Sequence, residues 1–246
     1  MLKLHSEGTK VATLAKNLRA LGYYTGPATK VFDVEVQKAV RAFQMQNADV
    51  EGRPLAVDGI VGPVTAASIA RRLGQLVVPD IATAGLVTIP ETGGSARARA
   101  ALAIAIQELN AGNGEEGGNN RGPHVRKYLN GIVDEGNDWC AGFVSWCFSQ
   151  SGPMPFNYTV GARDVLKQLR AKGLCVEPSE TDPPRPGDVI VWWRKAPTAW
   201  QGHVGLVLSY RGGVLSTIEG NKTPKVGRFS YTFGKIERLL GFARVV

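Results

Sequence analysis

A change in the character of the sequence at Pro183-Pro184-Arg185-Pro186 is the feature that most constrains the fold. Beyond it, short runs rich in β-branched and aromatic residues are separated by glycine and proline, a pattern typical of antiparallel strands. We expect strands at 188–194, 203–210, 214–219, 228–233 and 240–245. Because helical patterns precede these strands, the second part of the chain is predicted to be an α+β domain with an antiparallel sheet.

The first part of the chain has a helical pattern of its own. The apolar residues of its first helix recur three and four positions apart: Val11, Leu14, Leu18 and Leu21. Gly22 ends that helix, Asp33 is a suitable N-cap for a second, and Pro63 suits the first position of a third. We therefore predict an all-α three-helix domain over residues 1–74.

Between these parts, residues 75–95 show no clear period and carry Pro79, Pro90 and Gly93-Gly94, which predicts a linker. Helices are then expected at 96–110, around 125–129 and at 139–150, with a polar, glycine-rich loop at 111–123. The second domain accordingly spans residues 96–246.

Composition limits the partners of the chain. Its 246 residues, 43% of them hydrophobic, can fill the cores of two domains, and its net charge of +8 favours anionic partners. The basic residues are scattered and no nucleic-acid-binding motif is present, so we expect no nucleic-acid partner. No apolar run reaches the length of a membrane span, so membrane insertion is not expected.

The start of the chain has no apolar segment of the signal-peptide type. The protein therefore stays in the cytoplasm, leaves it by a route that the sequence does not encode, or has lost a leader.

The three cysteines, Cys140, Cys147 and Cys175, form no C-x-x-C pair and too small a set for a disulfide framework. Asp138 can cap a helix that has Cys140 in its first turn, where the helix dipole would stabilise a thiolate. A buried core thiol is the alternative interpretation of Cys140. Cys147 lies two turns further along the helix and is predicted to be a packing residue.

The strands at 203–210 and 214–219 are joined by Arg211-Gly212-Gly213, a tight-turn signal. Folding the hairpin about this turn brings His203 opposite the neighbourhood of Glu219 to Asn221. Residues two apart, and directly opposed residues, share a face of a sheet. The hairpin thus predicts an imidazole beside a carboxylate and an amide, the base and orienting partner that a thiol nucleophile requires.

Four segments around these residues follow one another in the order seen in CHAP domains: Trp139-Cys140-Ala141-Gly142-Phe143-Val144, Pro186-Gly187-Asp188-Val189, Gly202-His203-Val204-Gly205 and Glu219-Gly220-Asn221. From about Ala96 to Val246 the chain resembles this family of cysteine, histidine-dependent amidohydrolases/peptidases, which are papain-like enzymes that cut peptidoglycan. The resemblance implies Cys140 as nucleophile, His203 as base, and Glu219 and Asn221 as polar partners.

The first 73 residues resemble a three-helix peptidoglycan-binding module. The matching segments are Leu21-Gly22-Tyr23-Tyr24-Thr25-Gly26, Phe32-Asp33, Ala39-Val40-Arg41-Ala42-Phe43-Gln44 and Val57-Asp58-Gly59-Ile60-Val61-Gly62-Pro63-Val64-Thr65. On this basis we expect Tyr23, Tyr24 and Asp58 to contact the substrate. The pairing of the two domains looks like a phage endolysin, which is made in the host bacterial cytoplasm and reaches the cell wall through a separate pore protein.

Further substrate contacts are expected in the second domain. Some CHAP domains bind calcium through an acidic loop before the nucleophile, but residues 114–120 do not match the EF-hand spacing, so no metal and no cofactor are expected. We predict instead that this loop, with Asn119 and Asn120, lines the substrate groove. Trp139, Trp193 and Trp200 are predicted to form its walls, with core packing as the alternative.

The resulting hypothesis is hydrolysis of a peptidoglycan amide bond through a thioester, by a monomer whose partner is bacterial peptidoglycan. The sequence leaves open whether the enzyme is an amidase or an endopeptidase. Two alternatives remain: a non-catalytic wall-binding protein with a decayed hydrolase domain, and an acyl or amide transferase that uses the same cysteine.

Overall fold

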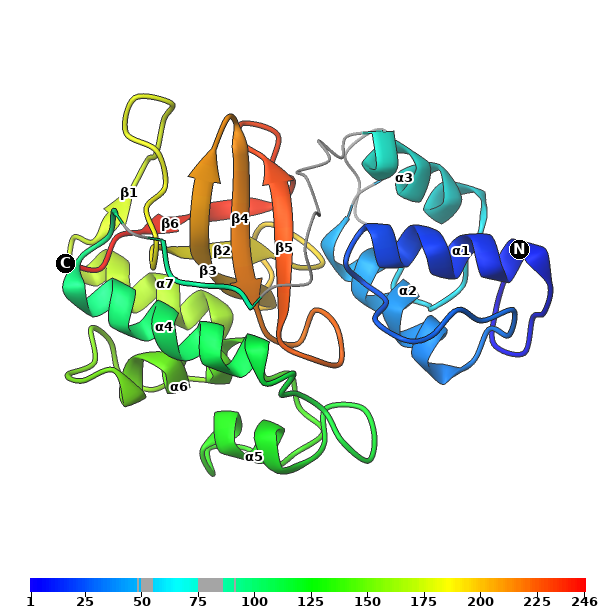
Figure 1. Ribbon diagram of the computed structural model, residues 1–246, viewed down its shortest axis with the longest axis horizontal. Helices are drawn as coiled ribbons and strands as arrows, with labels where there is room; N and C mark the ends of the chain where they lie inside the picture. The colour runs from blue at the N-terminus through cyan, green and yellow to red at the C-terminus, as the bar shows by residue number, and fades with distance from the viewer. Residues whose placement is uncertain (48, 50–54, 75–85, 91) are drawn as a thin grey trace.

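The computed structural model describes residues 1–47, 49, 55–74, 86–90 and 92–246 (Figure 1). Of the predicted linker at 75–95, residues 75–85 and 91 lie outside the described residues. The helices are α1 (Thr9–Ala20), α2 (Val34–Gln46), α3 (Pro63–Gly74), α4 (Ala96–Asn110), α5 (Pro123–Leu129), α6 (Cys140–Gln150) and α7 (Ala162–Ala171). The strands are β1 (Cys175–Val176), β2 (Val189–Trp193), β3 (Gly202–Arg211), β4 (Val214–Glu219), β5 (Gly227–Thr232) and β6 (Leu239–Ala243).

Helices α1, α2 and α3 form the three-helix module, which has a hydrophobic core of its own. Its fully buried members include Val11, Leu18, Phe32, Val36, Val40 and Phe43. Asp33 caps α2 as predicted, because its carboxylate accepts a hydrogen bond from the backbone N–H of Val36 at 2.9 Å. The all-α prediction for this part of the chain is confirmed.

The remaining elements, from α4 to β6, form the sheet domain. Its strands pair antiparallel in the order β1-β6-β2-β3-β4-β5. Alternate side chains of β2 and β3 point to opposite faces, so Val189, Val191 and Val204 pack against α4, α6 and α7. These helices lie along one face of the sheet (Figure 1). The α+β prediction is confirmed.

Two elements of this domain, α7 and β1, were not predicted from the sequence. Helix α7 buries Ala162, Val165, Leu166 and Leu169, a spacing of three and four that predicts a helix and could have revealed it. Strand β1 has two residues and pairs with β6, and a run that short carries no periodic signal.

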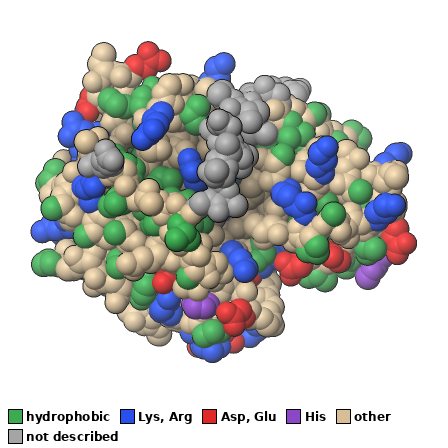
Figure 2. Space-filling model, in the orientation of Figure 1, with side chains coloured by type: hydrophobic (Ala, Val, Ile, Leu, Met, Phe, Trp, Pro, Cys, Tyr) green, Lys and Arg blue, Asp and Glu red, His purple; other side chains and the backbone are tan. Residues whose placement is uncertain are grey.

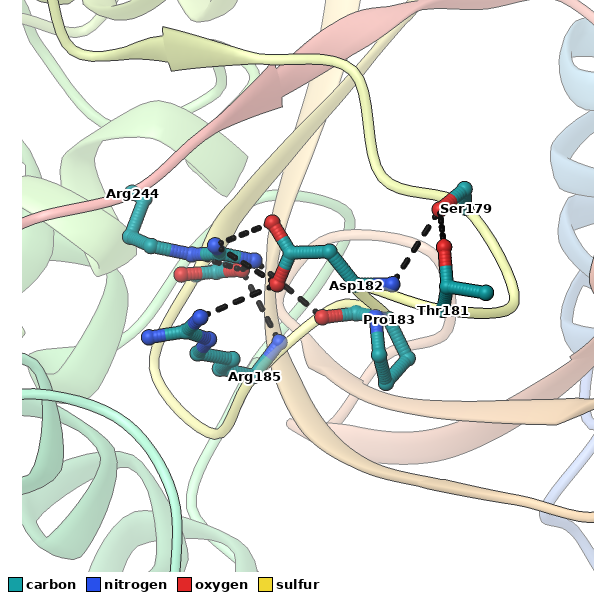
Figure 3. A network of polar contacts seen from close by, with 7 residues as sticks. Ser179, Thr181, Asp182, Pro183, Arg185 and Arg244 are labelled. Carbon is teal, nitrogen blue, oxygen red and sulfur yellow. Dashed lines mark hydrogen bonds and ion pairs between the residues drawn. The ribbon is translucent and has the colours of Figure 1, made fainter.

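A network of ion pairs ties the end of the chain to the entry of β2 (Figure 3). Arg244 binds Asp182 at 2.9 Å and the buried Asp188 at 3.3 Å, while Arg185 binds Asp182 at 2.9 Å. Burial raises the pKa of Asp188, and the backbone N–H of Arg185 and the Arg244 guanidinium oppose that shift. The network joins the segment that leads into β2 to the residue that follows β6.

The three-helix module lies beside the β5 edge of the sheet domain (Figure 1). Arg238 donates hydrogen bonds to the backbone carbonyls of Met45 and Asn47, and Lys38 pairs with Glu115. Lys and Arg side chains are spread over both parts of the visible surface rather than gathered in one patch (Figure 2). Among the described residues, no helix is both long enough and apolar enough to cross a membrane.

Candidate active site

The β3–β4 hairpin carries the predicted base and its partner, and a bulge sets their register. The strands pair Arg211 with Val214 at the turn, but the register shifts between Val207 and Ser209, so that Gly205 lies opposite Glu219. Leu208 is the residue left unpaired by this bulge. If Leu208 were paired in a regular register, Glu219 would face Leu206 and point to the other side of the sheet. The bulge therefore places Glu219 on the face that carries His203.

The His203 imidazole and the Glu219 carboxylate are fully buried and directly bonded. His203 Nε2 donates to Glu219 Oε2 at 2.8 Å. The second oxygen, Oε1, accepts from Thr217 at 2.5 Å and from Tyr231 at 2.6 Å. The Lys222 ammonium lies 3.5 Å from the carboxylate. Both oxygens are thus bonded, which fixes the imidazole ring and its tautomer.

The charges around this pair keep the carboxylate ionised. Burial alone would raise the pKa of Glu219, but the Lys222 charge and the hydrogen bonds from His203 and Thr217 outweigh it and lower that pKa to about 2. Lys222 itself is buried against the rings of Phe229 and Tyr231, at 4.1 and 4.6 Å from their centroids.

Gly205 provides the space through which Glu219 reaches the imidazole. A Cβ at this position would lie 2.6 Å from Glu219 Cγ, closer than real Cβ contacts. A side chain here would displace the carboxylate from His203. The glycine in the predicted Gly202-His203-Val204-Gly205 segment is therefore explained by a contact across the hairpin.

Cys140 is the first residue of α6, so its backbone N–H has no partner within the helix. Two expectations about its setting are wrong. The N-cap is Trp139, without a side-chain hydrogen bond, and Asp138 instead accepts from Asn221 at 2.9 Å. The helix start does not lower the thiol pKa, because burial raises it to about 11 against the opposing effects of Arg194 and of the Val204 and Ala141 N–H groups.

Arg194 is a residue of the site that was not predicted from the sequence. Its Nη2 lies 2.8 Å from His203 Nδ1 and donates to it, and its side chain is buried. Within the described part of the chain, no hydrogen bond joins the Cys140 thiol to the imidazole. Arg194 lies two residues beyond Trp192, which pairs with His203, so the alternation along β2 could have placed it on this face.

The His203 imidazole is held neutral in this setting. Burial lowers its pKa, the hydrogen bond with Glu219 raises it, and the Arg194 charge lowers it further, for a result of about 4. Asn221, the other predicted partner, adopts a left-handed backbone conformation with φ of 59° and directs its amide to Asp138 rather than to the imidazole.

The predicted groove residues of the sheet domain separate into three groups. Trp139 is fully buried, stacks on Tyr128 with 5.3 Å between ring centroids and donates to Glu115 at 3.1 Å, so it does not form a groove wall. Trp193 is half-buried beneath the Arg238 guanidinium, whereas Trp200 is 83% exposed. Asn119 and Asn120 line a cleft of about 190 Å³ between the two parts of the chain, together with Asp138 and Asn221.

Two of the three side chains that were predicted to contact substrate from the three-helix module make hydrogen bonds within it. Tyr24 is buried and donates to the carbonyl of Pro27, and the Asp58 carboxylate accepts from the side chain of Gln44 and the N–H of Ile60. These two side chains are therefore engaged within the module. Tyr23 is also buried, but one side of it lines the cleft. No cluster of three potential metal ligands occurs among the described residues.

Both parts of the chain match models of known protein families. Residues 7–69 match the model of a putative peptidoglycan binding domain. Residues 132–221 match the CHAP domain, and this range includes Cys140, His203, Glu219 and Asn221. The chain therefore combines a peptidoglycan-binding domain with a CHAP domain, the architecture of a peptidoglycan hydrolase-like cell-wall protein. No curated protein matched this chain.

Proposed function

We propose that this protein hydrolyses an amide bond of bacterial peptidoglycan, with Cys140 as nucleophile and the three-helix module as anchor. The observation that carries the proposal is the buried His203–Glu219 pair beside the start of α6, where Cys140 lies within a CHAP domain. The pairing of the two domains supports a lytic role of the phage endolysin type.

In the proposed mechanism, Nδ1 of His203 is the basic atom, because Nε2 is bound to Glu219. The resting thiol and imidazole are both neutral, so the thiol proton passes to Nδ1 as Sγ attacks the carbonyl carbon. The negative charge that develops on the carbonyl oxygen is stabilised by the backbone N–H of Cys140, which has no partner within α6.

The tetrahedral intermediate then collapses with breakage of the C–N bond. The imidazolium returns its proton to the leaving amine, and Cys140 is left as a thioester. Glu219 stabilises the imidazolium during this step. Water, activated by the neutral imidazole, hydrolyses the thioester and regenerates the thiol.

The test is clearing of purified peptidoglycan by the wild type and by Cys140→Ala, with mass analysis of the released fragments. We expect the wild type to release fragments, and the variant to sediment with the wall without cutting it. The new termini identify an amidase or an endopeptidase, and products that carry an added amine acceptor identify a transferase. Binding without cleavage by both proteins would refute the proposal and favour a wall-binding protein.

A further inference from the structure

Arg194 occupies the position that the proposed mechanism requires to be free. Its Nη2 donates to His203 Nδ1 at 2.8 Å, the same atom that has to receive the thiol proton. Its Nη1 lies 3.4 Å from Asp138 Oδ2 and 4.0 Å from Met45 Sδ of the three-helix module. The guanidinium must leave the imidazole before His203 can act as a base.

The Arg194 charge is incompletely paired where it lies. The residue is 3% exposed, and its Nε has no hydrogen-bond partner within the described chain. Lys222, the buried cation nearby, is paired with the fully buried Glu219, whereas the Asp138 side chain is 59% exposed to solvent. Because the exposed Asp138 only partly compensates this buried charge, the guanidinium can bind a second carboxylate. It can hold such a group through two parallel hydrogen bonds.

A cleft between the two parts of the chain adjoins the Arg194 guanidinium, which is itself buried. Met45 and Asp138, which both contact Nη1, line the cleft, so Arg194 lies directly behind that part of its wall. Lys38, Arg41 and Lys222 also line it, and Glu115 is bound to Lys38. Against these three cations stand Glu115 and Asp138, so the described lining has a small excess of positive charge.

We propose that Arg194 binds a carboxylate of the peptide part of the substrate, and that this contact draws the guanidinium away from His203 Nδ1. Substrate binding then unmasks the base, and an amide substrate without a carboxylate at this position is a poor one. Arg194 is thereby a specificity-determining residue of the site. This inference rests on the proposed function, since it assumes that His203 accepts the Cys140 proton.

The first experiment needs no hydrolysis. Cys140 of the full chain is alkylated with the anionic reagent iodoacetate and with the neutral reagent iodoacetamide. The two rates are followed by mass analysis of the Cys140 peptide. The ratio of the iodoacetate rate to the iodoacetamide rate is then divided by the same ratio for free cysteine. We expect the wild type to favour the anionic reagent and Arg194→Gln to lose about tenfold or more of that preference, as for loss of a charged hydrogen bond. An unchanged ratio in a folded Arg194→Gln protein would overturn the proposal.

Arg194→Lys keeps a cation in place without the two-pronged geometry, and an intermediate ratio is expected. It also serves if Arg194→Gln does not fold. Lys167→Gln, on α7, is the matched charge control and should retain the wild-type ratio. A control that loses the preference equally would assign the effect to net charge and refute a specific role for Arg194.

The second experiment compares soluble wall peptides that differ in one group, a free carboxylate or its amide. We expect the wild type to show a higher kcat/KM for the acid by about tenfold or more, and Arg194→Gln to show no preference. Equal rates on both peptides in the wild type would refute the inference alone. Failure of the wild type to cut either the peptides or whole peptidoglycan would refute the proposed function.

Discussion

The two halves of the candidate site differ in how completely the fold has assembled them. On the imidazole side, His203 and Glu219 are bonded to each other and to Thr217 and Tyr231, and every polar atom of the carboxylate has a partner. On the thiol side, Cys140 is buried against backbone N–H groups, and its pKa is raised to about 11. Arg194 is bonded to His203 Nδ1, the atom that has to receive the thiol proton.

The difference follows from the elements that build each half. Strand register positions the imidazole half, and a fully satisfied buried network is rigid. The thiol is on a helix that packs against the sheet, and burial disfavours its charged form. A neutral, buried thiol is a weak target for oxidation.

The largest loss of activity is expected from a substitution on the thiol side of the site. Cys140→Ser keeps the size and position of the nucleophile but replaces the thiol with a hydroxyl that a His203 of low basicity cannot deprotonate. We expect peptidoglycan clearing to fall on the order of 10⁴- to 10⁶-fold, with wall binding unchanged in sedimentation. Cys175→Ser is the control and should clear peptidoglycan at the wild-type rate. A Cys140→Ser enzyme within tenfold of wild type would remove Cys140 from the chemistry.

Glu219→Gln breaks the imidazole side. The amide can no longer stabilise an imidazolium, and Lys222 is left buried without its anionic partner. We expect kcat to fall by roughly 10²- to 10⁴-fold and the protein to unfold at lower temperature. The measurement is turnover on a soluble wall peptide beside a thermal melt. Glu180→Gln, an exposed carboxylate, should change neither, and a Glu219→Gln protein with normal turnover would show that the pair is structural.

Gly205→Ala tests the rigidity of the same half without altering its charges. The added methyl would lie 2.6 Å from Glu219 Cγ and push the carboxylate away from Nε2. We expect turnover to fall roughly 10- to 100-fold, the effect of a misplacement of about 1 Å. Gly62→Ala is the matched control, because nothing lies within 4 Å of its Cβ position. Equal turnover in the two variants would mean that the carboxylate can move without consequence.

The imidazole half is also the half that the sequence could predict. The tight turn at Arg211-Gly212-Gly213 brings His203 and Glu219 together, although the match depends on a bulge near Val207 that no residue pattern announced. An unbulged hairpin would have put the two side chains on opposite faces. The prediction that His203 and Glu219 share a face is therefore correct, but only because of the bulge that the structure shows.

The thiol half was harder to predict because its properties come from tertiary burial. The sequence placed Cys140 correctly at a helix start, and from that position a lowered pKa follows only if solvent reaches the thiol. Arg194 directly follows β2, and its contacts with Asp138 and Met45 join residues that are distant in sequence. Trp139 was expected in the groove, but its ring is needed to pack against Tyr128.

The buried His203 imidazole also gives the protein a pH dependence of stability. Burial, with the Arg194 and Lys222 charges, lowers its folded pKa to about 4 from 6.5, although Glu219 opposes the shift. The unfolded chain therefore takes up a proton first as the pH falls. The stabilisation is complete above pH 6.5 and is lost progressively toward pH 4, at no more than about 1.4 kcal/mol per pH unit. In thermal melts across this range, the melting temperature should fall more steeply with decreasing pH for the wild type than for His203→Gln.

His5→Gln, which replaces an exposed imidazole, should keep the wild-type slope. Parallel slopes for wild type and His203→Gln would mean that the imidazole is protonated as readily in the folded protein as in the unfolded chain, and that the imidazole side of the site does not hold His203 neutral.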